Sequence, residues 1–339
     1  MNILPLPEIC DSKKAYNADY CVRNISRLQK YAEEWKKKNN ILNSVEDKKK
    51  IHLLVIDDQY DFTYPEGALF VAGRSGKGAM EAQEKLVNFI YRYLHKITKI
   101  TCTMDSHFPL QIFFPAAHLR EDGSHPEAHT VISASDYAKG IYRANPGMAD
   151  VLKVDPGWLN NQFRFYCEEL ERKGKYSLYL WPYHCLLGSN GHRLSGPVEE
   201  ACLFHSFARE VDFRPVIKGD NPLTEHYSVF SPETDTCWDG SERFRVNTSG
   251  LMKSLFDSEA VLIAGLASSH CVKESINDLV AEIKKTNPEL AGKFYILRDC
   301  MAPVVIPGGP DFTGEAERAL NNFQDFGMNV VDSENPILF

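Results

Sequence analysis

The chain has 339 residues, of which 43% are hydrophobic and 25% charged, and its formal net charge is −8. These values are typical of a folded globular protein and exclude collagen, disordered chains and disulfide-stabilised mini-proteins. No long basic run occurs, so nucleic acids and anionic membranes are not expected as partners. The longest apolar run, Ala260–Ala267, is far shorter than the roughly 20 residues that a membrane-spanning helix needs.

The cysteines favour a reducing compartment. The sequence has nine, they are scattered, and no two form a Cys-x-x-Cys pair. The N-terminal segment lacks the basic start and long apolar core of a secretory signal peptide. We therefore expect free thiols and a cytoplasmic location, and the sequence is compatible with a homo-oligomer.

Residues 1–50 are expected to form an N-terminal extension of largely helical structure. This segment is polar and rich in lysine, and Leu28, Tyr31 and Trp35 recur at positions i, i+3 and i+7. The spacing predicts a helix over roughly Arg23–Lys38.

Residues 51–339 are expected to form the main domain, in which short apolar runs alternate with amphipathic segments. The runs, which predict strands buried on both faces, are His52–Ile56, Ile100–Met104, Pro215–Ile217, Val261–Ala264, Phe294–Leu297 and Asn329–Val331. Apolar stripes at helical spacing predict helices near residues 86–94, 198–209, 251–256, 272–283 and 316–326. This alternation predicts an α/β fold with a doubly wound, mostly parallel sheet and helices on both faces.

Two long stretches interrupt the alternation, Phe108–Leu180 and Leu223–Ser249. Both run between a strand end and the next predicted element, and the first contains Pro, Gly, His and Tyr throughout. Loops of this length in a compact domain commonly form lids or pocket walls. We place an insertion into the main domain at about residues 115–180.

Residues with reactive side chains follow the predicted strands. Asp57, Asp105 and Lys218 each come directly after an apolar run, and Cys271 begins a predicted helix. Ligands of doubly wound folds bind at the carboxyl ends of the strands, so we expect these residues to lie close together. A thiol at a helix N-terminus gains thiolate character, and the free N–H groups there can hold an oxyanion. Asp57 as base and Lys218 as its charge partner would complete a nucleophilic site.

A second group of residues is suited to a metal ion. In Asp105-Ser-His107, positions i and i+2 of an extended chain point the same way, so the carboxylate and the imidazole can share one cation. A mixed oxygen and nitrogen set suits Zn²⁺, Fe²⁺ or Mn²⁺. His184 is a candidate third ligand. The alternatives that spacing leaves open are His118, His125 and His129.

Five sequence blocks in fixed order resemble the motifs of a known family. The blocks are Leu54-Val-Ile-Asp57-Asp-Gln59-Tyr-Asp61-Phe62, Thr103-Met-Asp105-Ser-His107, Trp181-Pro-Tyr-His184-Cys185, Ile217-Lys218-Gly219 and Gly265-Leu-Ala267-Ser-Ser-His270-Cys271-Val272. Together they resemble the nicotinamidase branch of the isochorismatase-like cysteine hydrolases, over about residues 51–335. The resemblance implies the isochorismatase-like form of the α/β fold, enlarged here by long insertions.

The resemblance also implies the roles of single residues. It implies a catalytic triad of Asp57, Lys218 and Cys271, and an oxyanion hole made by the N–H groups of Ala267 and Cys271. A cis peptide bond is expected between Leu266 and Ala267.

Two further sets of residues follow from the same resemblance. One divalent metal ion, with zinc preferred over iron or manganese, would be held by Asp105, His107 and His184. The substrate-binding aromatic residues would be Phe62, Trp181 and Tyr227.

The function that the resemblance implies is that of a metal-assisted cysteine amidohydrolase. Nicotinamide and water would give nicotinate and ammonia through a thioester on Cys271, a step of NAD salvage. The partner would thus be a small-molecule amide. Two alternatives remain open: hydrolysis of another small amide or a ureido acid on the same triad, or a non-catalytic metal-binding scaffold.

Overall fold

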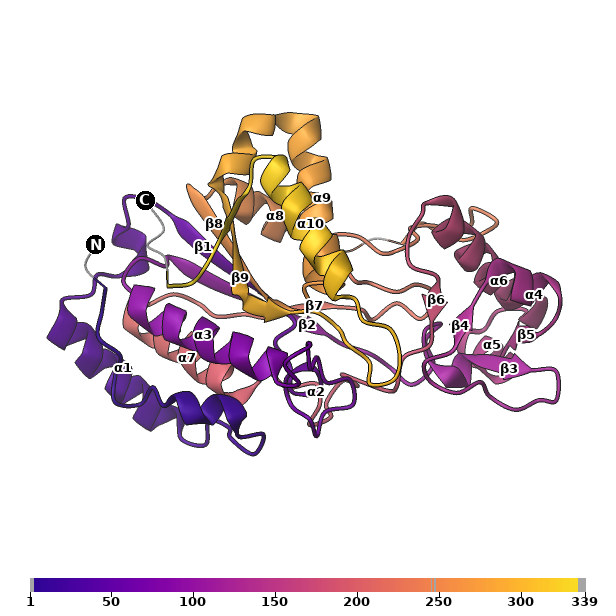
Figure 1. Ribbon diagram of the computed structural model, residues 1–339, viewed down its shortest axis with the longest axis horizontal. Coiled ribbons are helices and arrows are strands. Elements are labelled where there is room, and N and C mark those ends of the chain that lie inside the picture. The colour runs from indigo at the N-terminus through magenta and orange to yellow at the C-terminus, as the bar shows by residue number, and fades with distance from the viewer. Residues whose placement is uncertain (1–2, 245, 247, 335–339) are drawn as a thin grey trace.

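The computed structural model describes residues 3–244, 246 and 248–334 of the chain. The ends of the predicted extension and of the predicted main domain, residues 1–2 and 335–339, lie outside the described residues. The centre of the molecule is a six-stranded sheet (Figure 1). Its strands are β1 (Ile51–Ile56), β2 (Lys99–Asp105), β7 (Val216–Lys218), β8 (Ala260–Leu266), β9 (Phe294–Ala302) and β10 (Asn329–Val331).

The sheet has the order β10-β9-β8-β1-β2-β7, and its neighbouring strands pair in parallel. Each of the six strands of this sheet overlaps an apolar run that predicts a strand. After β1, the chain first adds β2 and β7 on one side of that strand. It then adds β8, β9 and β10 on the other side, so the direction of strand addition reverses between β1 and β8. Such a reversal is the topological switch point at which doubly wound folds bind their ligands.

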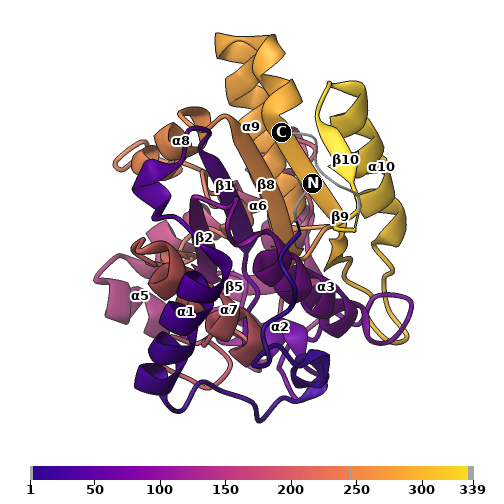
Figure 2. The same ribbon diagram turned by 90° about the vertical axis from the view of Figure 1, so that its left-hand side faces the viewer.

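Helices cover both faces of the sheet (Figure 2). Successive side chains of a strand point to opposite faces. Accordingly, Leu53 and Val55 of β1 belong to a core with α3 and α7, whereas Leu54 and Ile56 belong to a second core with α8, α9 and α10. These helices span Gly78–Tyr93 (α3), Gly196–Arg209 (α7), Ser249–Phe256 (α8), Cys271–Thr286 (α9) and Thr313–Asp325 (α10). The predicted doubly wound α/β class is therefore confirmed.

The N-terminal segment packs on the outside of α7. Its main helix, α1 (Ile25–Asn39), begins after Asn24, whose side chain caps the helix, and contacts α7 through Leu28 and Ala32. The predicted stripe is wrong at Tyr31, which is exposed, because the buried face of α1 runs through Ala32 instead. The short helices η1 (Ser12–Tyr16) and η2 (Ser44–Glu46) flank α1.

Residues 115–180 form a separate lobe beside the sheet, at the right of Figure 1. The prediction of loop structure is wrong for this segment, because it folds into helices and short strands. They are η3 (Pro115–Ala117), β3 (His118–Arg120), β4 (Val131–Ile132), α4 (Ala134–Ala138), β5 (Tyr142–Ala144), α5 (Pro146–Leu152), α6 (Pro156–Arg172) and β6 (Leu178–Tyr179). Their buried side chains form one core that continues to Phe62, Trp181 and Leu266 at the edge of the sheet.

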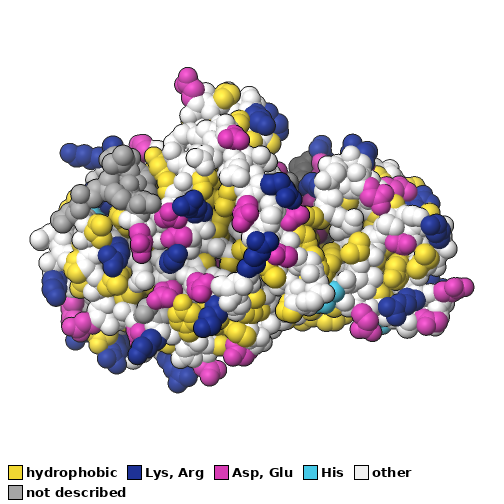
Figure 3. All heavy atoms as spheres, viewed as in Figure 1, with side chains coloured by type: hydrophobic (Ala, Val, Ile, Leu, Met, Phe, Trp, Pro, Cys, Tyr) yellow, Lys and Arg dark blue, Asp and Glu magenta, His cyan; other side chains and the backbone are white. Residues whose placement is uncertain are grey.

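The remaining elements are α2 (Tyr60–Thr63), directly after β1, and η4 (Pro288–Lys293), before β9. Charged side chains of both signs are dispersed over the face that Figure 3 shows. Within the described ranges, no helix combines the length and apolar character needed to cross a membrane. All nine cysteines are free thiols.

Candidate active site

The ends of four strands bring the predicted reactive residues to one place. Asp57 follows β1, Asp105 ends β2 and Lys218 ends β7, and the parallel register pairs Asp105 directly with Lys218. Cys271 is the first residue of α9, after the turn that leaves β8. Because β8 and β1 flank the switch point, Cys271 and Asp57 meet across it.

The Lys218 ammonium lies at the centre of this group. Its Nζ is 2.8 Å from Asp57 Oδ2, 2.8 Å from Asp105 Oδ1 and 3.6 Å from Cys271 Sγ. It also donates a hydrogen bond to the carbonyl oxygen of His226 at 2.8 Å. All of these side chains are buried. One cation is thus shared by two carboxylates and a thiol that are largely shielded from solvent.

Burial sets the protonation of these groups. It raises the pKa of Asp57 above its usual range, although the neighbouring Lys218 lowers it. Burial alone would lower the pKa of Lys218, but Asp105 and Asp57 raise it well above its usual value, so the ammonium stays charged. Burial also raises the pKa of the Cys271 thiol, and this outweighs the lowering by Lys218. The thiolate character predicted for Cys271 is thus opposed by burial and favoured by Lys218, and it stays a prediction.

Buried polar side chains hold the two acids in place. The Thr103 hydroxyl donates to Asp57 Oδ1 at 2.5 Å and accepts from the Asp57 backbone N–H at 3.1 Å. The side-chain amide of Gln59 binds both backbone groups of Asp105. Its Oε1 accepts from the Asp105 N–H at 2.7 Å, and its Nε2 donates to the Asp105 carbonyl oxygen at 2.8 Å. Asp57 itself has a positive φ of 45°, which turns the chain sharply at the end of β1.

The turn before Cys271 contains the expected cis peptide bond, between Leu266 and Ala267. The Ala267 carbonyl oxygen accepts hydrogen bonds from the N–H groups of His270, at 3.0 Å, and Val272, at 3.2 Å. Cys271 then begins α9, where the first N–H groups of a helix have no partner within the helix.

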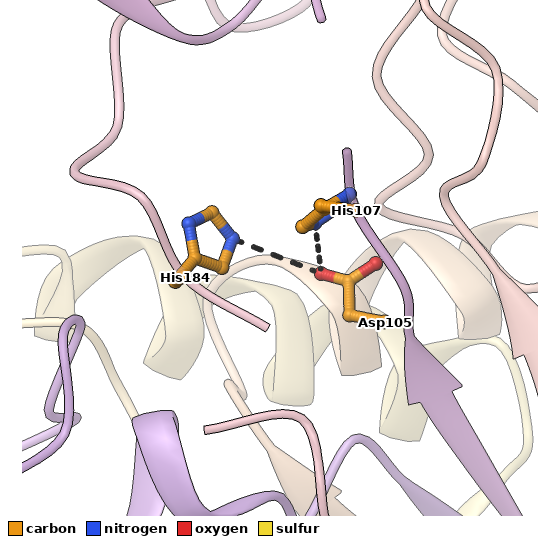
Figure 4. Close-up of side chains that lie close together, drawn as sticks. All are labelled: Asp105, His107 and His184. Carbon is orange, nitrogen blue, oxygen red and sulfur yellow. Dashed lines mark ion pairs between the residues drawn. The ribbon is translucent and has the colours of Figure 1, made fainter. Parts of the chain in front are cut away.

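The predicted metal ligands also come together (Figure 4). Asp105 Oδ2 lies 3.1 Å from His107 Nε2 and 4.0 Å from His184 Nε2, and the three candidate ligand atoms are all within 4.8 Å of one another. The Nδ1 atoms of the two histidines face carbonyl oxygens, that of His107 at Gly219 (2.9 Å) and that of His184 at Pro182 (2.8 Å).

These carbonyl contacts decide which ring nitrogens are free. A carbonyl oxygen accepts only, so each Nδ1 carries the proton and each Nε2 presents a lone pair toward Asp105. His107 Nε2 is buried, and Asp105 Oδ2 is the polar atom that it faces. A carboxylate and two imidazole nitrogens that face one another at these distances suit a shared cation. The donor set therefore fits a divalent metal ion.

The structure distinguishes His184 from the other candidate histidines. His118 lies in the lobe of residues 115–180, where it contacts the Tyr137 hydroxyl and the Ile112 carbonyl oxygen. His125 and His129 lie in the same lobe and do not belong to the group around Asp105. His184 stands on the segment that returns from the lobe to α7, so its place depends on tertiary structure and not on spacing.

Gly219 is required beside these ligands. Its φ is +86°, and a Cβ atom there would lie 2.6 Å from Asp105 Oδ1 and 2.7 Å from His107 Cε1. The glycine of the block Ile217-Lys218-Gly219 thus lets the backbone pass close to the metal-ligand group.

A small cavity of about 30 Å³ adjoins Cys271. The predicted aromatic residues Phe62, Trp181 and Tyr227 line it, and Trp181 Nε1 donates to the Tyr227 hydroxyl at 3.1 Å. The other lining residues are Leu69, Val71, Asp105, His184, Glu225, Leu266, Ala267, His270, Cys271 and Val304.

Two of these lining residues were missed by sequence reasoning. Glu225 is buried, and its burial raises the pKa of its carboxyl to about 7. It lies in the long segment between β7 and α8, where no local pattern marks it. His270 directly precedes Cys271, and this adjacency was a signal that could have identified it.

Comparison with known proteins gives a match in structure. Two structures of the yeast nicotinamidase Pnc1p share the fold. The one bound to the inhibitor nicotinaldehyde has a TM-score of 0.52 and 18% identity, over 83% of this chain and 99% of that chain. The other has a TM-score of 0.51 and 20% identity, with the same coverage. No protein-family model and no curated protein sequence matches. The predicted resemblance is thus confirmed at the level of the fold.

Proposed function

We propose that the chain is a cysteine amidohydrolase that converts nicotinamide and water into nicotinate and ammonia. The observation that carries the proposal is the position of the Lys218 ammonium, which touches the Asp57 carboxylate and the Cys271 thiol within one buried cluster. A nucleophilic thiol needs a base and a charge partner within hydrogen-bond reach, and this cluster supplies both. The likeness of the fold to a yeast nicotinamidase supports the choice of substrate.

The first half of the reaction forms a thioester. Asp57, whose pKa is raised by burial, accepts the Cys271 proton as Sγ attacks the carboxamide carbon. The negative charge on the amide oxygen is held by the N–H groups of Ala267 and Cys271, each worth about 3 kcal/mol in comparable sites. The C–N bond then breaks, and Asp57 returns the proton to the departing nitrogen, which leaves as ammonia.

The second half returns the enzyme to its starting state. Asp57 accepts a proton from a water molecule, whose oxygen attacks the thioester carbon. The C–S bond breaks, Cys271 regains its proton and nicotinate is released. Throughout, the Lys218 ammonium stabilises the carboxylate of Asp57 and the sulfur while each carries negative charge.

The residues that would hold a divalent metal ion are Asp105, His107 and His184. A metal ion held there would supply a Lewis acid beside the cavity, toward a ring nitrogen of the substrate. Phe62 and Trp181 would flank the ring. Because the cavity is only about 30 Å³, we expect its walls to move apart when an aromatic amide enters.

Ammonia release from nicotinamide by the purified protein tests the proposal. We expect steady release that Cys271→Ala abolishes. A matched control is Cys300→Ala, which removes a different buried thiol. Cys300 lies on β9, the strand beside β8 in the sheet. Release that persists in Cys271→Ala would contradict thiol catalysis. If the protein releases ammonia from another small amide but not from nicotinamide, the catalytic roles of the triad stand and nicotinamide is rejected as the substrate.

A further inference from the structure

Tyr176 joins the lobe of residues 115–180 to the turn that carries Cys271. It lies between α6 and β6, and its hydroxyl donates to the Ser269 carbonyl oxygen at 3.0 Å. The same hydroxyl accepts a hydrogen bond from Lys273 Nζ at 2.8 Å. One side chain of the lobe thus binds the chain on both sides of Cys271.

The ring of Tyr176 makes a third contact with this turn. It stacks on the His270 ring, with centroids 4.8 Å apart and an interplanar angle of 24°. The His270 ring also meets Trp181 at 5.6 Å and Tyr227 at 5.3 Å, and these three rings line the cavity. Tyr176 therefore supports a cavity wall from behind, without lining the cavity itself.

Lys273 is itself held firmly on this side of α9. Its Nζ lies 4.0 Å from the centroid of the Tyr176 ring and 3.0 Å from Glu274 Oε1, and its side chain is only 17% exposed. Cation–π contacts of this kind gain strength when water is largely excluded. The first turn of α9, which begins at Cys271, is thereby fixed to the lobe.

We propose that Tyr176 is a positioning residue for the proposed reaction, through which the lobe of residues 115–180 sets the place of Cys271. Sγ of Cys271 is 3.6 Å from Lys218 Nζ, a distance at which the ammonium still stabilises a thiolate. Releasing the turn lengthens this contact on average, which disfavours the thiolate. The His270 ring loses its backing at the same time. The part of this inference that concerns turnover rests on the proposed function, whereas the part that concerns thiol reactivity does not.

Two substitutions separate the contacts of Tyr176. Tyr176→Phe keeps the ring and removes the hydroxyl, and Tyr176→Ala removes both. Tyr142→Phe is the matched control, because Tyr142 is also partly buried in the same lobe, in β5. Each variant is assayed for kcat and KM with nicotinamide, and for the rate at which iodoacetamide alkylates Cys271 at several pH values, followed by peptide mass spectrometry. Thermal melting checks that each variant is folded.

We expect Tyr176→Phe to lower kcat about fivefold with KM within twofold, as for the loss of one or two net hydrogen bonds. Its alkylation of Cys271 at neutral pH should slow about threefold, with the midpoint of the pH profile moved upward. Tyr176→Ala should lower kcat further and raise KM, because the His270 wall loosens.

A folded Tyr176→Phe whose kcat and alkylation profile both match those of Tyr142→Phe would overturn the inference, even if Tyr176→Ala does not fold. If the unsubstituted protein does not hydrolyse nicotinamide, the proposed function fails, and the alkylation profiles still decide the role of Tyr176.

Discussion

Lys218 illustrates how one residue serves both stability and chemistry. Its buried ammonium is paired with Asp57 and Asp105, so removing it leaves two carboxylates facing each other without a counter-charge. Breaking a buried ion pair from one side typically costs about 3–5 kcal/mol of stability. A loss of activity in a Lys218 variant is therefore informative only when folding is measured beside it.

The pH dependence of turnover tests the role of Asp57. Since burial raises the pKa of this carboxyl, the base form is lost as pH falls through a value above the usual aspartate pKa of about 4. We expect kcat/KM to fall on acidification with a midpoint above pH 4, measured from pH 4 to 8 at constant ionic strength. Circular dichroism at each pH excludes unfolding as the cause. Activity that stays undiminished down to pH 4 would contradict a general base with a raised pKa.

Metal content tests the group around Asp105. His184→Ala removes one of three ligand atoms, so we expect the purified variant to hold less metal by elemental analysis and to lose nicotinamide hydrolysis. His125→Ala is the control, since His125 lies in the lobe and contacts the His118 carbonyl oxygen. Equal metal content in the two variants would contradict the ligand set. Removal of metal from the unsubstituted protein with a chelator should likewise reduce nicotinamide hydrolysis.

Among the secondary-structure elements, the central strands were predictable because their sequence signal is local. A parallel strand buried on both faces appears as a run of β-branched and aliphatic residues, as in Ile100–Met104, and needs no knowledge of its neighbours. Helix α6 shows why the lobe was missed. Its buried residues Leu159, Phe163, Tyr166 and Leu170 do follow helical spacing, after the capping Asp155. They are separated by polar residues in a stretch rich in loop-forming residues, which obscured the stripe.

Without the family resemblance, the site was predictable mainly where a reactive residue follows a strand or begins a helix. Asp57, Asp105 and Lys218 are marked in this way, because parallel strands end at the same edge. His184, Glu225 and Tyr176 stand on long connections whose course depends on tertiary packing. The proposed roles of all these residues, and the division of the chain into extension and main domain, stay predictions.

Helix α7 is expected to make stability sensitive to acid. His205 is fully buried there, bonded through Nε2 to the Ile97 carbonyl oxygen, and burial lowers its pKa to about 4. The unfolded chain binds this proton near pH 6.5, so the neutral histidine costs stability increasingly as pH falls from about 6.5 toward 4. The contribution reaches about 3 kcal/mol.

We therefore expect the melting temperature to fall between pH 7 and pH 5, and His205→Gln to reduce that fall. Gln keeps a donor for the carbonyl oxygen and does not titrate. Melting curves of both proteins at the two pH values, in matched ionic strength, provide the measurement. If the melting temperature falls by the same amount between pH 7 and pH 5 in both proteins, His205 is not responsible for the loss of stability in acid.

At the scale of the whole molecule, the lobe and the sheet build the cavity together. β2 and β7 are neighbours in the sheet, although the lobe and α7 come between them in the chain. The chain thus leaves the sheet at Asp105 and returns to its neighbour at Lys218, and the segment between supplies Trp181 and His184. A small amide would be enclosed by both parts of the molecule.

The switch point between β1 and β8 also has a consequence for the order of folding. Asp57 and Cys271 are separated by more than half of the chain, so their contact forms only after the intervening segments have closed a very long loop. Contacts between residues so far apart in sequence form slowly. We expect that, after dilution from denaturant, far-ultraviolet circular dichroism recovers before nicotinamide hydrolysis does. Simultaneous recovery would mean that the sheet and the site form in one step. The reactive thiol is then exposed to oxidants during the interval in which helices have formed and the cluster around Lys218 has not.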